Sequence, residues 1–309
     1  MKIFRHIIFW MCFLILFIMV YAFREDIYIF YNRLVYESKN EVKILEKNEY
    51  YRDYDFEFVQ NTVNFTPHNY QEILNIFYTI INSGSETFSF ICPSEYVECI
   101  EDVKKLANDR TTLSHINNYV HPYNSFKHIE TQYTSYGEVT VTVSKTYSID
   151  DINKINGKVE QISNTLLINN NSTDLEKIRL VHDFIINNSK YDTDRTNNNI
   201  IAYRSDIAYG PLFEGFGICG GYSDAMQLFL EKLNIKNFKV SSETHIWNAI
   251  NLDGVWYHLD LTWDDPVTSS GVDLLEYDYF LIDTIKLISN GRVEHNFDHT
   301  VYTEMKMKQ

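Results

Sequence analysis

Cys219 lies in the segment GFGICGGYSDAM (215–226), where a glycine-rich turn gives way to apolar spacing typical of a helix. A thiol at a helix start is close to the positive end of the helix dipole and to unpaired backbone N–H groups, which favour the nucleophilic thiolate. The neighbouring glycines would let a substrate carbonyl approach the backbone, where N–H groups could hold an oxyanion. An isolated cysteine is more often a buried structural residue. Gly217, Gly220 and Gly221 weaken that interpretation here.

Two runs of alternating residues follow in HIWNAINLDGVWYHLDLT (245–262). Asp253 and Gly254 between them favour a hairpin with a two-residue turn and positive φ at both positions. This turn predicts the pairing of the whole hairpin, beginning with Leu252 opposite Val255. One face is then expected to be apolar core, with Asn248 as its one exception, and carries Ile246, Ile250, Leu252, Val255, Tyr257, Leu259 and Leu261. The other is expected to be a polar platform and carries His245, Trp247, Ala249, His258, Asp260 and Thr262.

On the polar face, the predicted register makes His245 and Asp260 diagonal neighbours, about 7 Å apart. That spacing lets a carboxylate hold an imidazole by one ring nitrogen, whereas a three-residue turn would separate the two residues. A cysteine at a helix start with a histidine–aspartate pair on a neighbouring sheet is the arrangement of nucleophile, base and orienting group. Cys219, His245 and Asp260 are therefore the candidate catalytic residues. In these roles the thiolate attacks an acyl carbon, His245 transfers the proton and Asp260 fixes the imidazole tautomer.

The sequence resembles the bacterial transglutaminase-like superfamily, whose fold is papain-like. The resemblance runs from about Asp174 to Pro266 through KIRLVHDFIINNSKYD, AYGPLFEGFGICGGYSDAM and HIWNAINLDGVWYHLDLTWDDP, in that order. It implies a Cys–His–Asp triad at Cys219, His245 and Asp260, the positions that match the family's three motifs. The first 150 or so residues show no comparable resemblance.

Competing interpretations of the same residues are weaker. Gly215, Gly217 and Gly220 spell G-x-G-x-x-G, but AYGPLFE before them does not look like a buried strand, so we expect no dinucleotide cofactor. A zinc site would have to use His245, His258, Cys219 and Asp260, which lack close metal-ligand spacing, so we expect no metal.

Three further candidates favour structural roles. His258 shares the polar face with Asp260, and a hydrogen-bonded structural role is favoured for it. His182 is expected to be a satisfied core histidine. Asp264 and Asp265 precede Pro266 and are typical of a turn.

Length and charge limit the class of protein. The chain has 309 residues, enough for two domains at about 150 residues each. Its net charge is −15, and it lacks the clustered positive charge that phosphate binding needs, so nucleic acid is not an expected partner. Four cysteines are too few for a disulfide scaffold. Cys92 and Cys99 are compatible with a disulfide or with two buried thiols.

An uninterrupted apolar run from Ile7 to Phe23 follows the basic residues Lys2 and Arg5. Its length suits a short membrane-spanning helix, and the charge asymmetry would keep the N-terminus in the cytoplasm and place the C-terminal domain outside. We therefore expect a single-pass membrane protein; the alternative is a secreted protein whose signal segment has been cleaved.

The remaining patterns divide the chain into four segments: an anchor or signal (1–23), a stalk (24–60), a small α/β unit (61–150) and a transglutaminase-like domain (151–309). Apolar periodicity predicts helices at 70–81 and after Gly217, alternation predicts a strand at 138–145, and Thr173 with Glu176 predicts a capped helix start.

The expected fold class is α+β with a papain-like C-terminal domain. The expected function is that of a cysteine acyltransferase, peptidase or amidase that acts on protein or peptide amide bonds through a thioester. The outward orientation suggests cell-envelope proteins or peptides as substrates. The alternative is a catalytically idle binding or scaffold module.

Overall fold

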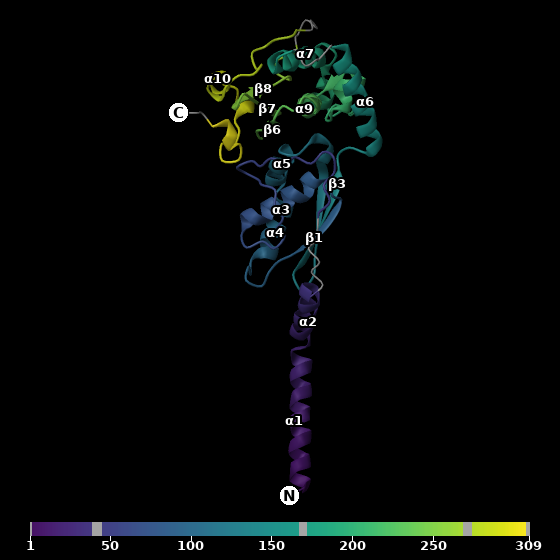
Figure 1. The fold of residues 1–309 in the computed structure, drawn as a ribbon, viewed down its shortest axis with the longest axis vertical. Coiled ribbons are helices and arrows are strands. Elements are labelled where there is room, and N and C mark those ends of the chain that lie inside the picture. Colours follow the sequence, from purple (N-terminus) through teal and green to yellow (C-terminus); the bar gives the residue numbers. More distant parts are fainter. Residues whose placement is uncertain (1, 39–44, 167–171, 268–273, 307–309) are drawn as a thin grey trace.

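The computed structural model describes residues 2–38, 45–166, 172–267 and 274–306. A helical rod begins at the N-terminus and leads to a body in two parts, the second of which carries the C-terminus (Figure 1). Helices pack beside small, mostly antiparallel sheets, so the fold is α+β, as expected.

The rod consists of α1 (Lys2–Ala22) and α2 (Arg24–Ser38) (Figure 1). Within it, the 19-residue span Phe4–Ala22 is predominantly apolar and is not buried. A helix of that length spans about 28 Å, close to the roughly 30 Å hydrocarbon core of a bilayer. Helix α1 is therefore long and apolar enough to cross a membrane, and a signal sequence would pass the same test.

The stalk expected at residues 24–60 differs from the structure in its second half. Residues 39–44 lie outside the described part of the chain. Residues 45–60 pack along the body, where Phe56 and Val59 are buried in the hydrophobic core. The apolar residues of this segment follow no helical or strand period because the segment contains neither a helix nor a strand.

Arg52 joins this segment to both parts of the body. Its guanidinium is buried and donates to the backbone oxygens of Tyr119 at 2.8 Å and of Asn237 at 3.1 Å. It also forms an ion pair with Glu231. Because these partners belong to different parts of the chain, one side chain fixes three segments together.

The first part of the body is a three-stranded antiparallel sheet, in the order β1-β3-β2, covered by helices. Its helix α3 and strand β3 confirm the expected elements at 70–81 and 138–145. Strand β2 had no sequence signal, because Ile129 is its only buried residue. The elements are α3 (Tyr70–Ser83), β1 (Thr87–Ile91), α4 (Cys99–Asn108), α5 (Arg110–Asn118), η1 (Pro122–Asn124), β2 (Phe126–Tyr133) and β3 (Glu138–Lys145).

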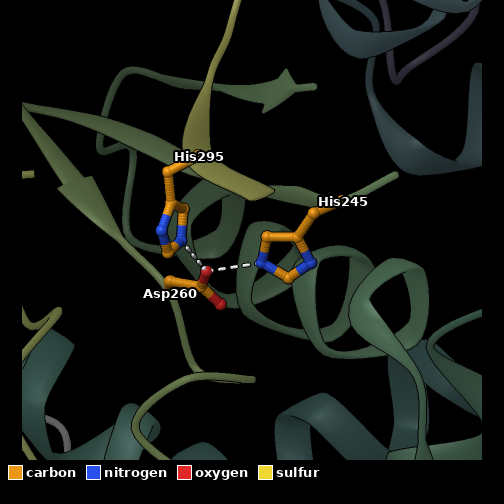
Figure 2. A group of neighbouring side chains, drawn as sticks. All are labelled: His245, Asp260 and His295. Atoms are coloured by element: carbon orange, nitrogen blue, oxygen red, sulfur yellow. Dashed lines mark hydrogen bonds and ion pairs between the residues drawn. The ribbon is translucent and has the colours of Figure 1, made fainter. Parts of the chain in front are cut away.

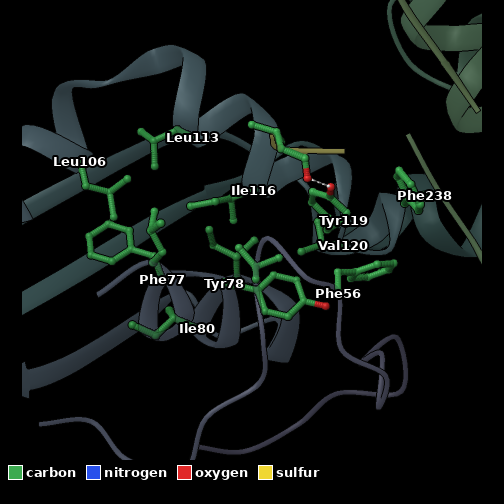
Figure 3. Close-up of a cluster of buried hydrophobic side chains, with 14 of the residues drawn as sticks. Phe56, Phe77, Tyr78, Ile80, Leu106, Leu113, Ile116, Tyr119, Val120 and Phe238 are labelled. Carbon is green, nitrogen blue, oxygen red and sulfur yellow. Dashed lines mark hydrogen bonds between the residues drawn. The ribbon is translucent and has the colours of Figure 1, made fainter. Parts of the chain in front are cut away.

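The core of this part extends into the second part. Phe77 and Ile80 of α3 and Ile116 of α5 belong to one buried cluster, and Phe238 lies at the edge of this cluster (Figure 3). The ring of Phe238 stacks on that of Tyr119 at 5.0 Å between centroids. The two parts therefore share one hydrophobic core.

A disulfide between Cys92 and Cys99 closes the loop between β1 and α4, with a Cα–Cα distance of 5.7 Å. The backbone oxygen of Cys92 also accepts a hydrogen bond from the Arg33 guanidinium of α2 at 2.9 Å. The disulfide loop is thus one place where the helical rod contacts the body.

The second part of the body contains the remaining elements. The capping box of Thr173 and Glu176 opens α7, as predicted, and Leu175 in its first turn is 52% exposed. The elements are α6 (Ile149–Thr165), α7 (Asp174–Asn187), β4 (Lys190–Tyr191), α8 (Thr193–Asn198), η2 (Gly210–Glu214), β5 (Phe216–Gly217), α9 (Cys219–Lys232), β6 (Asn237–Ser241), β7 (Ile246–Leu252), β8 (Val255–Leu259), α10 (Thr284–Ser289), η3 (Val293–His295) and η4 (Thr303–Met305).

The hairpin β7–β8 has the predicted register. Leu252 pairs with Val255, and the ladder continues to Asn248 opposite Leu259. Asp253 has φ 51° and Gly254 has φ 82°, the positive values that the two-residue turn requires. Strand β6 completes an antiparallel sheet in the order β6-β7-β8.

Both faces of this sheet are covered, which corrects the expected polar platform. Helix α9 packs on the face that carries Ile250 and Leu259, where the amide of Asn248 donates to the backbone oxygen of Ser223 in α9 at 3.0 Å. The other face is closed by the C-terminal segment, whose Phe297 packs against Trp247. His245, His258 and Asp260 on that face are therefore buried, and each needs a partner inside the protein.

Candidate active site

Cys219 is the first residue of α9 and is partly buried. Ile218 before it has extended backbone, with ψ 178°, so the chain enters the helix at Cys219. The first amides of a helix have no acceptor within the helix. The structure therefore places the thiol at a helix N-terminus, as the sequence predicts.

The glycines beside Cys219 have a different role from the one expected. A Cβ at Gly221 would lie 2.2 Å from the backbone oxygen of Ser205, and one at Gly220 would lie 2.9 Å from that of Asp206. The amide of Ile218 also donates to Ser205 at 2.8 Å. The space at Gly220 and Gly221 is thus filled by the protein's own loop, so these two positions seat the start of α9 against that loop.

His245 and Asp260 meet at the open end of the hairpin. His245 immediately precedes β7, and Asp260 immediately follows β8. The Nε2 atom of His245 lies 2.5 Å from Oδ2 of Asp260 (Figure 2). The backbone N–H of His245 donates to the Ser242 hydroxyl at 3.1 Å, and its ring stacks on Trp247. The predicted diagonal pair is therefore a direct hydrogen bond between buried groups.

Asp260 is held by four donors. Its Oδ1 accepts from the backbone N–H of Thr262 at 3.0 Å and of Trp263 at 3.4 Å. Its Oδ2 accepts from His245 and, at 2.8 Å, from Nε2 of His295. Burial alone would raise the pKa of this carboxyl, but the charge of His245 and the two imidazole hydrogen bonds hold it well below its usual range. Asp260 is therefore an anion.

The pKa of His245 is shifted in the opposite direction. Burial lowers it, but the charge and hydrogen bond of Asp260, with a smaller contribution from Cys219, raise the pKa to about 10. The imidazole is therefore a cation at neutral pH. Because Asp260 and Cys219 both interact with it, the three candidate residues form one connected group.

His295 is the member of the site that the sequence did not reveal. It ends the short turn η3, far along the chain from the hairpin, and no periodicity or motif surrounds it. Figure 2 shows His295 and His245 on opposite sides of the Asp260 carboxylate. Only the folding of the C-terminal segment over the sheet brings His295 to this position.

His245, Asp260 and His295 also form a group whose nitrogen and oxygen atoms lie within 4.8 Å of one another, near enough to hold a metal ion. In this arrangement both Nε2 atoms are directed at one carboxylate oxygen. Hydrogen bonding accounts for that geometry, so the site needs no metal to explain it.

His258 lies on the same face but belongs to a separate chain of hydrogen bonds. The indole N–H of Trp247 donates to its Nδ1 at 2.9 Å, and its Nε2 lies 3.0 Å from the hydroxyl of Thr284. Burial, with the nearby charge of His295, lowers the pKa of His258 to about 3. A neutral, fully hydrogen-bonded imidazole fits the structural role expected for it.

His182 and the two aspartates after Trp263 are also structural partners. His182 is buried, and its Nε2 lies 3.1 Å from Oδ2 of Asp264. Asp265 accepts a hydrogen bond from the Tyr222 hydroxyl of α9 at 2.5 Å. The turn expected at these aspartates therefore ties the end of the hairpin to helices α7 and α9.

Tyr191 is a further neighbour of the site. Strand β4 pairs with β5 in parallel, with Tyr191 opposite Gly217, two residues before Cys219. Burial, together with the charges of Cys219 and Asp260, raises the pKa of the phenol to about 12. The hydroxyl therefore stays protonated beside the thiol.

Two solved structures are similar to this chain. One is the crystal structure of a TGase, with 10% sequence identity and a TM-score of 0.33, covering 45% of this chain and 44% of that one. The other is a putative cysteine protease from Cytophaga hutchinsonii, with 14% identity and a TM-score of 0.27, covering 48% of this chain and 65% of that one. The chain thus spans less than two thirds of either structure. No protein-family model and no curated protein matches the sequence.

Proposed function

We propose that the protein is a transglutaminase-like cysteine enzyme that cleaves or exchanges carboxamide or peptide bonds through a thioester at Cys219. The observation that carries the proposal is the 2.5 Å contact between Nε2 of His245 and Oδ2 of Asp260, with Cys219 near enough to contribute to the raised pKa of the same imidazole. The order of the three motifs along the chain supports the family.

In the first half of the reaction, the Cys219 thiolate attacks the carbonyl carbon of the amide and forms a C–S bond. The tetrahedral oxyanion is stabilised by N–H groups at the start of α9. The C–N bond then breaks, and the imidazolium of His245 gives its proton to the departing amine. Because Nε2 faces Asp260, Nδ1 is the nitrogen that exchanges the proton.

In the second half, water or a primary amine attacks the thioester carbon while His245 accepts its proton. Collapse breaks the C–S bond and releases an acid or a new amide, and the thiolate and imidazolium are restored. Asp260 stays ionised throughout and stabilises the imidazolium. Hydrolysis and amine transfer thus share one intermediate and differ only in the acceptor.

We also propose that the body lies outside the cell and acts on protein or peptide substrates there. The support is the apolar helix α1, which carries Lys2 and Arg5 at its start and is followed by Arg24, Glu25 and Asp26. The Cys92–Cys99 disulfide also fits an oxidising compartment. Protease added to intact cells should digest the body. Full protection of the body would contradict this orientation.

The reaction is tested with the full-length protein in detergent and 4-nitrophenyl acetate as the acyl donor. Intact-mass measurement should show one acetyl group that peptide mapping assigns to Cys219, and Cys219→Ala should not acquire it. Addition of glycine ethyl ester should divert product from acetate to the amide if the enzyme transfers to amines. Acetylation of wild type no faster than of His245→Ala would instead identify an idle module.

A further inference from the structure

We propose that His295 is a positioning residue that locks the Asp260 carboxylate in the orientation from which it binds His245. The inference rests on the proposed function, and it extends the group Cys219–His245–Asp260 by a fourth member. His295 touches neither a reacting atom nor Cys219 in this proposal and acts through Asp260 alone.

The first argument is the geometry at the shared oxygen. Oδ2 of Asp260 lies 2.5 Å from Nε2 of His245 and 2.8 Å from Nε2 of His295. The amide of Thr262 holds only the other oxygen, Oδ1. Without His295, the donor left at Oδ2 would be His245 itself, which is the side chain that the carboxylate has to orient.

The second argument is the hydrogen bonding of His295 itself. The residue is 4% exposed, and within the described residues its Nδ1 has no hydrogen-bond partner. A buried imidazole with one unsatisfied nitrogen is a poor packing residue, since an apolar side chain would fill the space without that loss. The hydrogen bond to Asp260 is the contact that an apolar side chain at this position could not make.

The third argument is that His295 is rigidly held. Its ring stacks on Tyr279 at 4.8 Å between centroids and meets Trp247 edge-on at 5.0 Å and Trp263 at 5.6 Å. An aromatic enclosure on three sides fixes the direction of the Nε2–H bond. His295 can therefore transmit the position of the C-terminal segment to Asp260.

The test compares two substitutions that separate donation from packing. His295→Gln places an amide N–H near the position of Nε2 but removes the ring, whereas His295→Phe keeps a ring in the aromatic enclosure but removes the donor. His295→Leu is a second donor-free variant in case the larger phenylalanine impairs folding. Each full-length variant is assayed for acetylation of Cys219 by 4-nitrophenyl acetate, and its melting temperature is recorded.

A positioning role predicts that His295→Phe and His295→Leu slow acetylation by about 10- to 100-fold, the range seen when a residue that orients a ligating side chain is removed. His295→Gln should recover most of the acetylation rate, even if it melts at a lower temperature than His295→Phe. An acetylation rate that follows the melting temperature, so that His295→Phe is faster than His295→Gln, would overturn the proposal. Failure of wild type to acetylate would instead refute the proposed function.

A pH profile supplies an independent readout. The titratable groups that face His295 are Asp260, His245, His258 and Tyr279, and Arg292 lies over the neighbouring Trp263 ring. An Asp260 carboxylate that is no longer held in place pairs less well with His245. The pH at which acetylation falls off on the alkaline side should therefore be lower in His295→Phe and His295→Leu but unchanged in His295→Gln. A shift to higher pH in Phe and Leu would mean that His295 only competes for the carboxylate charge, and would overturn the proposal.

Discussion

Two buried histidine–aspartate pairs lie on either side of one turn and behave in opposite ways. Asp260 pairs with His245 and Asp264 pairs with His182, and the amide of Asp264 donates to the backbone oxygen of Asp260 at 3.1 Å. The pKa of Asp260 is held low, whereas burial raises the pKa of Asp264 to about 6 despite its hydrogen bonds to His182 and to the amide of Tyr279.

The difference follows from the donors around each carboxylate. Asp260 has two imidazoles at 2.5 and 2.8 Å and two backbone amides. Asp264 has one imidazole at 3.1 Å and the Tyr279 amide at 2.8 Å, and the charge of Asp260 further raises its pKa. A buried histidine–aspartate contact is therefore not by itself a catalytic pair; the number of donors decides whether the carboxylate is held as an anion.

The largest expected effect distinguishes the two aspartates by activity. Asp260→Asn keeps the side-chain shape but loses the charge that orients and stabilises the His245 imidazolium, so the rate of Cys219 acetylation should fall by up to about 10⁴. Asp264→Asn is the matched control and should change the rate by less than about tenfold. Equal losses in the two variants would remove the distinction between the pairs.

The next effect distinguishes the histidines of the β7–β8 hairpin. His245→Asn removes the base and should slow acetylation by about 10²- to 10⁴-fold at pH 7. His258→Asn leaves an oxygen that can still accept from the Trp247 indole and should cost much less. Rates are measured on folded protein, confirmed by circular dichroism. A tolerated His245 change combined with an inactivating His258 change would show that the base is assigned to the wrong residue.

Alkylation with iodoacetamide tests whether His245 acts on the thiol. The raised pKa of His245, about 10, keeps its imidazole cationic near neutral pH, and a cation beside Cys219 favours the thiolate. Wild type should therefore be alkylated at pH 6 about tenfold or more faster than His245→Ala, while His182→Ala should react like wild type. Mass spectrometry of Cys219 peptides provides the rates.

The smallest expected effect concerns the free energy of unfolding, to which the two aspartates contribute with opposite dependence on pH. The folded pKa of Asp264 is raised from 3.8 to about 6, so the stability it contributes is present below about pH 4 and is lost as the pH rises through 6. Relative to Asp264→Asn, wild type should thus lose up to about 3 kcal/mol of unfolding free energy between pH 4 and pH 7.

The corresponding contribution of Asp260 has the opposite sign. Its folded pKa is lowered, so its stability is present above about pH 4 and is lost as the pH falls through the folded value. Urea denaturation of wild type and Asp264→Asn at pH 4 and pH 7 measures the Asp264 contribution, and the same measurement on wild type and Asp260→Asn at pH 5 and pH 3 measures that of Asp260. Trends of the same sign for the two aspartates would contradict the assigned charge states.

Much of the fold follows from local patterns. The alternation of β3 and the apolar period of α3 are visible in the sequence and are confirmed. Strand β2 and the packing of residues 45–60 are not visible, because Ile129 is the only buried residue of β2 and the buried side chains of 45–60 follow no period. Such segments gain their structure from contacts with distant residues, which no short window of sequence contains.

The sequence alone determined where the site's two local pieces begin. Asp253-Gly254 sets the hairpin register because a two-residue turn with positive φ leaves one pairing for the strands, and the start of α9 places Cys219 at a helix N-terminus. The tertiary structure decided the rest, because charge states depend on neighbours from remote segments. Folding of the C-terminal segment over the sheet buries the polar face, brings His295 to Asp260 and gives the two aspartates of one turn opposite pKa shifts.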